Sequence, residues 1–276
     1  MAQDRGSGSP RLERLKAFNQ AMSKEIREHK STFAVYIVLR GLVITALVLQ
    51  FLNGNYENVL LCLLVLALLL VPTFVQVRFR IDLPSTLEVI MLLFVFAAEI
   101  LGEMNSFYTI FPFWDTVLHT LNGFLAAAIG FALVDLLNRS STRFNLSPLY
   151  LSLVAFCFSM TIGVLWEFFE FSMDQLLGWD MQKDTIVHAI HTVMLDPTGS
   201  QQVVTIDGIT STAVNGRELG LGGYLDIGLI DTMEDLFVNF IGAFVFSIFG
   251  FLYVKNRGKG RFLGRFIPRR REDEEE

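Results

Sequence analysis

The sequence predicts an all-α fold: a polytopic integral membrane helix bundle of about six transmembrane helices, with a small folded extracytoplasmic loop. Two observations lead to this prediction. Hydrophobic residues make up 52% of the 276 residues, which is more than an ordinary soluble domain contains. They also fall in long blocks rather than in amphipathic stripes, and each block is close to the ~20 residues that cross the hydrocarbon core of a bilayer.

Six apolar blocks are the candidate membrane spans. About thirty mostly polar residues precede the first block, so we expect the first helix to act as an uncleaved signal anchor rather than as a signal peptide. The blocks cover residues 33–52, 59–75, 87–102, 117–137, 149–166 and 236–254.

Lys and Arg are distributed unevenly between the two sides of this predicted bundle. They gather in the N-terminal arm, in the second and fourth loops and in the C-terminal tail, whereas the opposite loops hold only Lys183 and Arg217. Cytoplasmic loops carry the excess of Lys and Arg in membrane proteins. The sequence therefore predicts a multi-pass protein of the cytoplasmic membrane with both termini in the cytoplasm.

The chain is predicted to have five segments. The first is an amphipathic arm on the inner membrane surface, where apolar residues recur at helical spacing, and it could also bind a partner. The last is a basic and then acidic tail that we expect to anchor at the interface. The segments are the cytoplasmic arm 1–32, transmembrane helices one to five in 33–172, the extracytoplasmic loop 173–230, the sixth helix 231–254 and the cytoplasmic tail 255–276.

The long loop is expected to fold. Asp184, His188 and His191 share one face at helical spacing, which predicts a surface helix. Two hairpin signals, Asp207-Gly208 and Asn215-Gly216, lie between β-rich runs further along and predict a short β-meander.

Polar residues recur at the outer ends of four predicted helices. Helices three and five end at the outer surface and helices four and six begin there, so the topology brings these residues to one depth in the outer third of the membrane. They are Glu99 on helix three, Asp115, His119 and Asn122 on helix four, Glu167 and Glu170 on helix five, and Asp231, Asp235 and Asn239 on helix six.

Some of these residues have an ordinary structural explanation. Asp115 is suitable as an N-cap, and Asp231 with Glu234 has the spacing of a capping box. Glu167 and Glu170 lie instead near the C-terminus of a helix, where the helix dipole disfavours a carboxylate. Ionisable residues within the membrane usually face an interior cavity and are functional.

The negative charges of this group need an explanation. The helix ends offer several carboxylates and one histidine but no Lys or Arg, and clustered carboxylates in a low dielectric do not all stay ionised without cations. Either a divalent metal is bound, or some carboxylates hold protons, or the group is a solvated rim. Carboxylates with a histidine inside a helix bundle are typical of di-iron and di-manganese sites, and the ligand types fit Mn, Fe, Zn or Mg.

Roles can be assigned under the metal interpretation. Glu167 and Glu170 are also candidates for a general base, and the remaining polar residues would support the site. The predicted metal ligands are Asp115, His119, Glu167, Glu170, Asp231 and Asp235, and the predicted supporting residues are Glu99, Asn122, Asn239, His188 and His191.

Three segments resemble the signature of the YjdF-like proteins, a family of bacterial membrane proteins whose function is unknown. They are FYTIFPFWDTVLHTLNGFLAA, GVLWEFFEFSMDQLLGWDMQKD and GGYLDIGLIDTMEDLFVNFIGA, with the patterns WD-x3-H, WE-x2-E and D-x3-DL-x2-N. The resemblance covers roughly residues 85–254. It implies a polytopic membrane protein in which Asp115, His119, Glu167, Glu170, Asp231, Asp235 and Asn239 are the family's recurring polar set.

Three classes of function fit these observations. The first is a membrane metalloenzyme with hydrolase or transferase chemistry on a lipid or lipid-linked substrate; the others are a receptor, sensor or scaffold without catalysis, and a cation- or proton-coupled transporter. The inner halves of helices four to six hold no ionisable residue that would continue a transport path.

The two cysteines, Cys62 and Cys157, lie in apolar blocks, which argues against a disulfide framework. The expected partner is the lipid bilayer and not nucleic acid.

Overall fold

The computed structural model describes residues 30–79, 81–140, 145–256 and 263–270. Within them, six helices are long and apolar enough to cross a membrane, which confirms the predicted polytopic helix bundle. These helices cover Thr32–Leu52, Tyr56–Arg78, Ser85–Met104, Trp114–Arg139, Pro148–Leu177 and Leu229–Lys255. They extend beyond the predicted apolar blocks because their ends also include the polar residues that flank those blocks.

Two of the six spans are irregular. The second is interrupted between α3 and α4, next to Pro72, whose ring cannot continue the hydrogen-bond ladder of a helix. The third continues from α5 into a π-helix, η1, at whose end the Asn105 side chain donates to the Ile100 carbonyl over 2.5 Å. The helices are α2 (Lys30–Leu52), α3 (Tyr56–Leu68), α4 (Val71–Phe79), α5 (Ser85–Val95), η1 (Phe96–Met104), α6 (Phe107–Ile110), α7 (Trp114–Ser140), α8 (Pro148–Leu177) and α9 (Leu229–Lys255).

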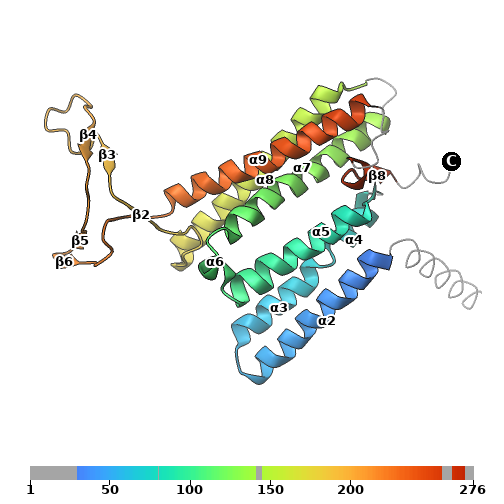
Figure 1. Ribbon diagram of the computed structural model, residues 1–276, viewed down its shortest axis with the longest axis horizontal. Helices are drawn as coiled ribbons and strands as arrows, with labels where there is room; N and C mark the ends of the chain where they lie inside the picture. Colours follow the sequence, from blue (N-terminus) through green and yellow to red (C-terminus); the bar gives the residue numbers. More distant parts are fainter. Residues whose placement is uncertain (1–29, 80, 141–144, 257–262, 271–276) are drawn as a thin grey trace, which may run out of the picture. The chain divides into compact units, whose positions relative to one another are not determined.

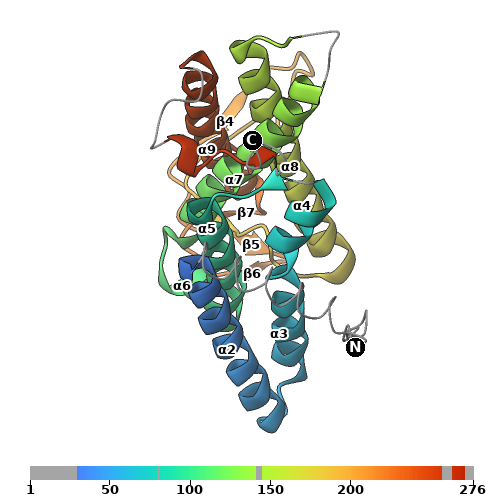
Figure 2. The same cartoon turned by 90° about the vertical axis from the view of Figure 1, so that its right-hand side faces the viewer.

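The chain forms two compact units, and the first contains residues 1–114, 131–148 and 249–276. In this unit α2 packs against α3 and α5, and both views show α2 and α3 side by side (Figures 1 and 2). Their shared core is a cluster of fully or nearly fully buried apolar side chains: Leu39, Val43, Cys62, Val65, Leu69, Leu92 and Ile100. Cys62 is therefore a core residue of this unit.

Short irregular elements complete the first unit. Strand β1 (Ile81–Asp82) pairs in antiparallel fashion with β8 (Arg269–Arg270), which follows the 3-10 turn η2 (Leu263–Arg265). Part of the predicted interfacial tail is thus paired with the connection between α4 and α5. The amphipathic helix predicted within residues 1–32 lies almost wholly outside the described residues, which begin at residue 30.

The second unit contains residues 115–130 and 149–248, and its helices α7, α8 and α9 cross at very short range. Gly242 of α9 lies directly against the Thr120 carbonyl of α7, and Gly123 of α7 lies directly against the Asn239 carbonyl of α9. A Cβ atom on Gly163 of α8 would lie 2.7 Å from Nδ2 of Asn239. Small residues of this kind let membrane helices bring their backbones close together.

Hydrogen bonds connect the three helices at this crossing. The Asn122 amide of α7 donates to Oδ1 of Asn239 on α9 over 3.2 Å, and the Asn239 amide faces Sδ of Met160 on α8 at 3.7 Å. Ser159 of α8 donates to the carbonyl of Gly123 on α7 over 2.7 Å. Asn239 is only 1% exposed, so its amide joins all three helices from within the core of this unit.

The loop between α8 and α9 extends away from the helices as a series of two-stranded ribbons (Figure 1). Strand β2 (Thr185–Val187) pairs with β7 (Tyr224–Asp226), β3 (Ile190–Thr192) with β4 (Val204–Ile206), and β5 (Ala213–Val214) with β6 (Arg217–Glu218). The predicted surface helix is wrong, because the described residues 178–228 contain no helix. The β-branched residues of TIV and IHT favour strands, and this preference prevails over the helical spacing of Asp184, His188 and His191.

One of the two predicted hairpins is confirmed. Asn215 and Gly216 both have positive φ angles, 53° and 77°, and join β5 to β6 through a two-residue turn. Gly208 also has a positive φ of 63°, but β4, which precedes it, pairs with β3. The predicted Asp207-Gly208 hairpin is therefore wrong, although the chain does turn at this glycine.

The short helix crossing predicts the effect of adding one methyl group. Gly242→Ala should lower the melting temperature of the detergent-purified protein, because the new Cβ would overlap the Thr120 carbonyl. Overpacking of this kind typically destabilises a protein by about 1–3 kcal/mol. The matched control is Gly41→Ala in α2, where nothing lies within 4 Å of the added Cβ. This control should leave the melting temperature unchanged or raise it, since Ala is the better helix former; equal melting temperatures for the two variants would contradict the proposed importance of the crossing.

Candidate functional site

One helical turn from the crossing, each of the three helices carries an ionisable side chain. His119 precedes Gly123 of α7 by four residues, Asp235 precedes Asn239 of α9 by four, and Glu167 follows Gly163 of α8 by four. Residues four apart lie on one face of a helix. Because α8 runs antiparallel to α7 and α9, four residues forward on α8 and four residues back on α7 and α9 lead to the same side of the crossing. The crossing therefore brings the three side chains together.

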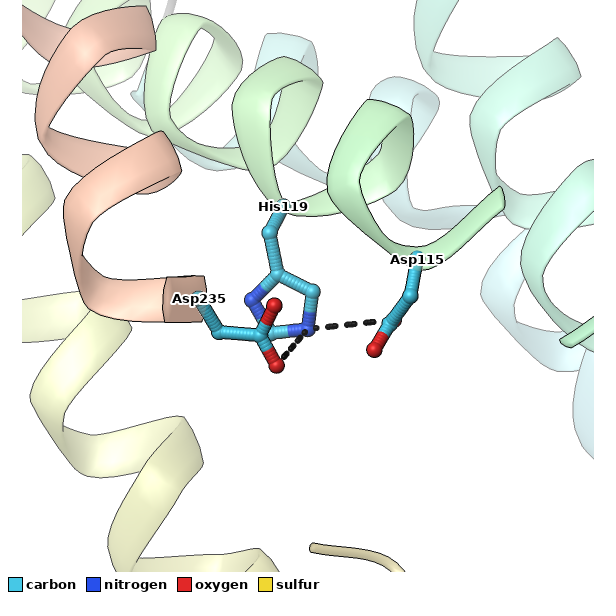
Figure 3. Close-up of side chains that lie close together, drawn as sticks. All are labelled: Asp115, His119 and Asp235. Atoms are coloured by element: carbon cyan, nitrogen blue, oxygen red, sulfur yellow. Dashed lines mark ion pairs between the residues drawn. The ribbon is translucent and has the colours of Figure 1, made fainter. Parts of the chain in front are cut away.

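His119 lies between two carboxylates, with its imidazole next to Asp115 of its own helix and Asp235 of α9 (Figure 3). Its Nε2 atom is 3.4 Å from Oδ1 of Asp115 and 3.5 Å from Oδ2 of Asp235. Its Nδ1 atom is on the side of Glu167, 3.9 Å from Oε1. These separations are longer than the usual 2.7–3.2 Å of a direct hydrogen bond.

The same separations fit a shared metal ion. Two ligand atoms bound about 2.1 Å from a tetrahedral zinc ion are separated by about 3.4 Å. Asp115, His119 and Asp235 offer one ligand atom each, all within 4.8 Å of one another. These three residues therefore form a candidate metal-binding group.

A second group adjoins the first and shares Asp235 with it. Glu167, Glu170 and Asp235 also offer ligand atoms that all lie within 4.8 Å of one another. Glu167 and Glu170 share one face of α8 because they are three residues apart. The two groups together contain four carboxylates and one imidazole.

Burial makes these carboxylates unusual. Glu167, Glu170 and Asp235 are only 4%, 7% and 5% exposed. Oε2 of Glu167, Oε2 of Glu170 and Oδ2 of Asp235 are buried without a hydrogen-bond partner. Buried polar atoms nearly always have such a partner, and a specific exception in a native structure requires an explanation such as a bound ion.

No direct ion pair with Lys or Arg offsets the negative charge in the described part of the chain. Among the described residues, no Lys or Arg nitrogen lies within 4.0 Å of the carboxylates of the two groups, and His119 is their one basic contact. Two like charges 4 Å apart repel by about 4 kcal/mol at an effective dielectric constant of 20. A divalent cation at the centre would turn this repulsion into attraction.

Trp166 positions one of the carboxylates and was not predicted as part of the site. Its indole N–H donates to Oε1 of Glu170 over 2.8 Å. Trp166 precedes Glu170 by four residues on α8, so this spacing was a usable signal in the sequence. The contact leaves Oε2 of Glu170 as the oxygen that is available to a ligand.

A short segment next to the site ties the end of α8 to the start of α9. The carboxylate of Asp174 accepts hydrogen bonds from the backbone N–H groups of Met181, over 2.7 Å, and Gln182, over 2.9 Å. Asp231 accepts from the N–H of Lys183 over 2.8 Å, and the Gln182 amide donates to the Thr232 hydroxyl. Asp231 is thus occupied on one oxygen and belongs to neither metal group, so its role as a ligand stays a prediction.

The predicted supporting residues fall in three places. Asn122 and Asn239 lie at the crossing, one turn below the two metal groups. His188 and His191 lie in the loop, where their Nδ1 atoms contact the Ile209 carbonyl and the Thr205 hydroxyl, each over 2.9 Å. The contacts found for these two histidines are within the described loop, so their predicted support of the site stays a prediction. Glu99 belongs to η1 in the first unit, and its role stays a prediction.

A shallow groove has Asp235 among its lining residues, although Oδ2 of this carboxylate is itself buried. Its volume is about 620 Å³, and it runs along the first turns of α9 beside Thr116 of α7. Apolar side chains dominate its walls, among them Leu229, Met233, Phe237 and Val238. A size of roughly 300–1,000 Å³ is usual for a ligand pocket.

Comparisons with known proteins place the chain in a family. The family model described as "Predicted membrane protein (DUF2238)" matches residues 35–256. An uncharacterized protein of Thermotoga maritima is 28% identical over 117 residues, which cover 41% of this chain and 59% of that relative. The chain thus matches less than two thirds of that relative's length. No solved structure matches the chain.

The family match includes five of the six candidate spans completely and most of the first. This agrees with the resemblance of the motif segments to a membrane-protein family of unknown function. The chain belongs to the DUF2238 family of predicted membrane proteins.

Proposed function

We propose that the protein binds a divalent metal between α7, α8 and α9 and uses it for hydrolase- or transferase-type chemistry on a lipid or lipid-linked substrate. One observation carries the proposal: three buried carboxylate oxygens, of Glu167, Glu170 and Asp235, have no hydrogen-bond partner and converge beside His119. Carboxylate and imidazole ligands suit Mn, Fe or Zn, with Mg as a further candidate.

The chemistry follows from the type of ligands. A bound divalent ion lowers the pKa of its water and polarises a carbonyl or phosphoryl oxygen. Asp115, His119 and Asp235 would hold the ion through three side chains, which leaves positions open for water and substrate. Glu167 and Glu170 would either complete the ligand set or take the proton from the bound water.

The groove supports an apolar substrate. Leu229, Met233 and Phe237 on its wall are 66%, 58% and 64% exposed, although they belong to a membrane-spanning helix. Such side chains contact hydrocarbon in a bilayer. A lipid could therefore bring its polar group to Asp235 while its apolar chain stays in the groove and the surrounding membrane.

Transport is less consistent with the same helices. Below the crossing, residues 120–134 of α7, 148–166 of α8 and 236–254 of α9 contain no Asp, Glu, His, Lys or Arg. The close contacts of Gly123, Gly163 and Gly242 fill the space between the helices at the crossing itself. A conduction path would need polar groups that continue through the membrane, so the lack of ionisable residues in these segments supports catalysis over transport.

The distribution of basic residues supports an extracytoplasmic site. Arg139 and Lys255 lie at the ends of α7 and α9 that are opposite the site, whereas the long loop at the site end holds only Lys183 and Arg217. By the positive-inside rule, the site would face away from the cytoplasm and both termini would face it.

Metal content tests the proposed centre. Protein purified in detergent without chelators should contain a stoichiometric divalent transition metal, or should take up Mn²⁺. His119→Ala and Asp235→Asn should each lower the affinity for Mn²⁺ by at least tenfold, because each removes a ligand of the group with the best spacing. Elemental analysis and equilibrium dialysis measure both quantities.

Glu234→Gln is the matched control, since Glu234 is an exposed acid directly before Asp235. It should leave the metal content unchanged, and size-exclusion profiles should show that all three variants are folded. A wild-type protein that holds no metal and takes up no Mn²⁺ would overturn the proposed centre.

Cysteine labelling tests the orientation. In a chain with Cys157 replaced by Ala, Gln201→Cys in the loop should react with a membrane-impermeant maleimide added to intact cells. Asn256→Cys, beyond the end of α9, should react only after the cells are opened. The remaining Cys62 is buried and should stay unlabelled. The reverse pattern would place the site on the cytoplasmic side.

A further inference from the structure

We infer that the site holds two divalent ions, with the Asp235 carboxylate as the bridge between them. This inference rests on the proposed function, because it specifies the composition of the same metal centre. One ion would bind Asp115, His119 and Asp235, and the other would bind Glu167, Glu170 and Asp235. The two groups are separate sets of ligand atoms that share this single residue.

The position of Asp235 suits a bridge. Asp235 is on α9, and each metal group combines it with two residues of another helix. These residues are Asp115 and His119 of α7 in one group, and Glu167 and Glu170 of α8 in the other. Oδ2 of Asp235 lies 3.5 Å from Nε2 of His119 and has no hydrogen-bond partner. A carboxylate has two oxygens with about four lone-pair positions, and paired metal ions in enzymes lie about 3.5–4 Å apart, a spacing that one carboxylate can bridge.

Charge favours two ions over one. Asp115, Glu167, Glu170 and Asp235 together carry a charge of −4 when ionised. One divalent ion would leave −2 in a buried site that has no Lys or Arg contact among the described residues, whereas two ions would bring the sum to zero. Neutralisation matters here because uncompensated charge is costly in a low-dielectric environment.

The unpartnered oxygens lie where the second ion needs them. Two of the three belong to Glu167 and Glu170, outside the group that contains His119. A single ion held by Asp115, His119 and Asp235 would leave these two oxygens without a partner. A second ion would supply that partner, which is why the inference goes beyond a mononuclear centre.

The second ion also changes the roles of two residues. Glu167 and Glu170 become ligands, so the general-base alternative no longer applies to them. Two ions held by three protein ligands each would have open positions for water and substrate and would activate that water as a nucleophile. Nδ1 of His119 lies on the side of Glu167, 3.9 Å from its Oε1.

Manganese is the probe for nuclearity. Detergent-purified wild-type protein, stripped of metal and dialysed against Mn²⁺, should bind about two ions per chain. Electron paramagnetic resonance at low temperature should show a broad signal from two coupled ions rather than the six-line signal of isolated Mn²⁺.

Two variants should each remove one ion. Glu170→Gln should lose the ion of the Glu167, Glu170 and Asp235 group, bind about one Mn²⁺ and give an isolated six-line signal. Asp115→Asn should lose the other ion and give the same result. Asp235→Asn should lose the coupled signal. Glu234→Gln is the control and should keep two coupled ions. The wild-type result alone decides the inference, so a variant that fails to fold does not prevent the test.

Three wild-type outcomes distinguish the inference from the proposed function. Two coupled ions support both. One ion per chain with a six-line signal overturns the bridge and leaves the proposed metal centre intact. No bound ion overturns both, and it would then leave the buried carboxylates to be neutralised by protons.

Discussion

The close crossing of α7, α8 and α9 is the constraint on which the site depends. Gly123, Gly163 and Gly242 remove the side chains that would keep these helices apart, and Asn239 fills the centre with an amide that reaches all three. The helices cannot slide past one another without breaking these contacts. Each ionisable residue one turn above is thereby fixed in register with the other two, so helix packing, and not a flexible loop, determines the geometry of the carboxylates.

This rigidity makes the charge problem unavoidable. Surface carboxylates that repel each other can turn toward water, but Glu167, Glu170 and Asp235 are held inward and are almost fully buried. The helix dipoles give only partial relief. The N-terminal end of α7 favours Asp115, but Glu167 and Glu170 lie well before the end of α8 at Leu177, outside the last turn where the dipole acts. A structure that holds several carboxylates inward in this way needs protons or cations to neutralise them, and the proposed metal centre would supply cations.

The sequence predicted the spans and the site better than the loop, for a physical reason. A span is dictated by its hydrophobic length alone, and alternate crossing of the membrane then brings His119, Glu167 and Asp235 to one depth. Their side-chain contacts depend on the Gly-mediated crossing, which spacing along one chain does not reveal. Trp166 was missed although its spacing of four residues from Glu170 places both side chains on one face of α8. In the loop, the helical spacing of three polar residues was a weaker signal than the strand preference of the β-branched residues between them. The strand that pairs with β4 depended on tertiary contacts, which a local turn signal does not specify.

The surroundings of the carboxylates bear on the proposed lipid substrate. The segment 181–183 is held across the ends of α8 and α9 by Asp174, Asp231 and Thr232, so the chain crosses these ends right beside the carboxylates. A groove beside Asp235 lies instead along the first turns of α9, with Leu229, Met233 and Phe237 in its wall. Under the proposed function, the chain of a lipid would lie on the apolar wall formed by Met233 and Phe237, with its polar end toward the candidate metal ligands.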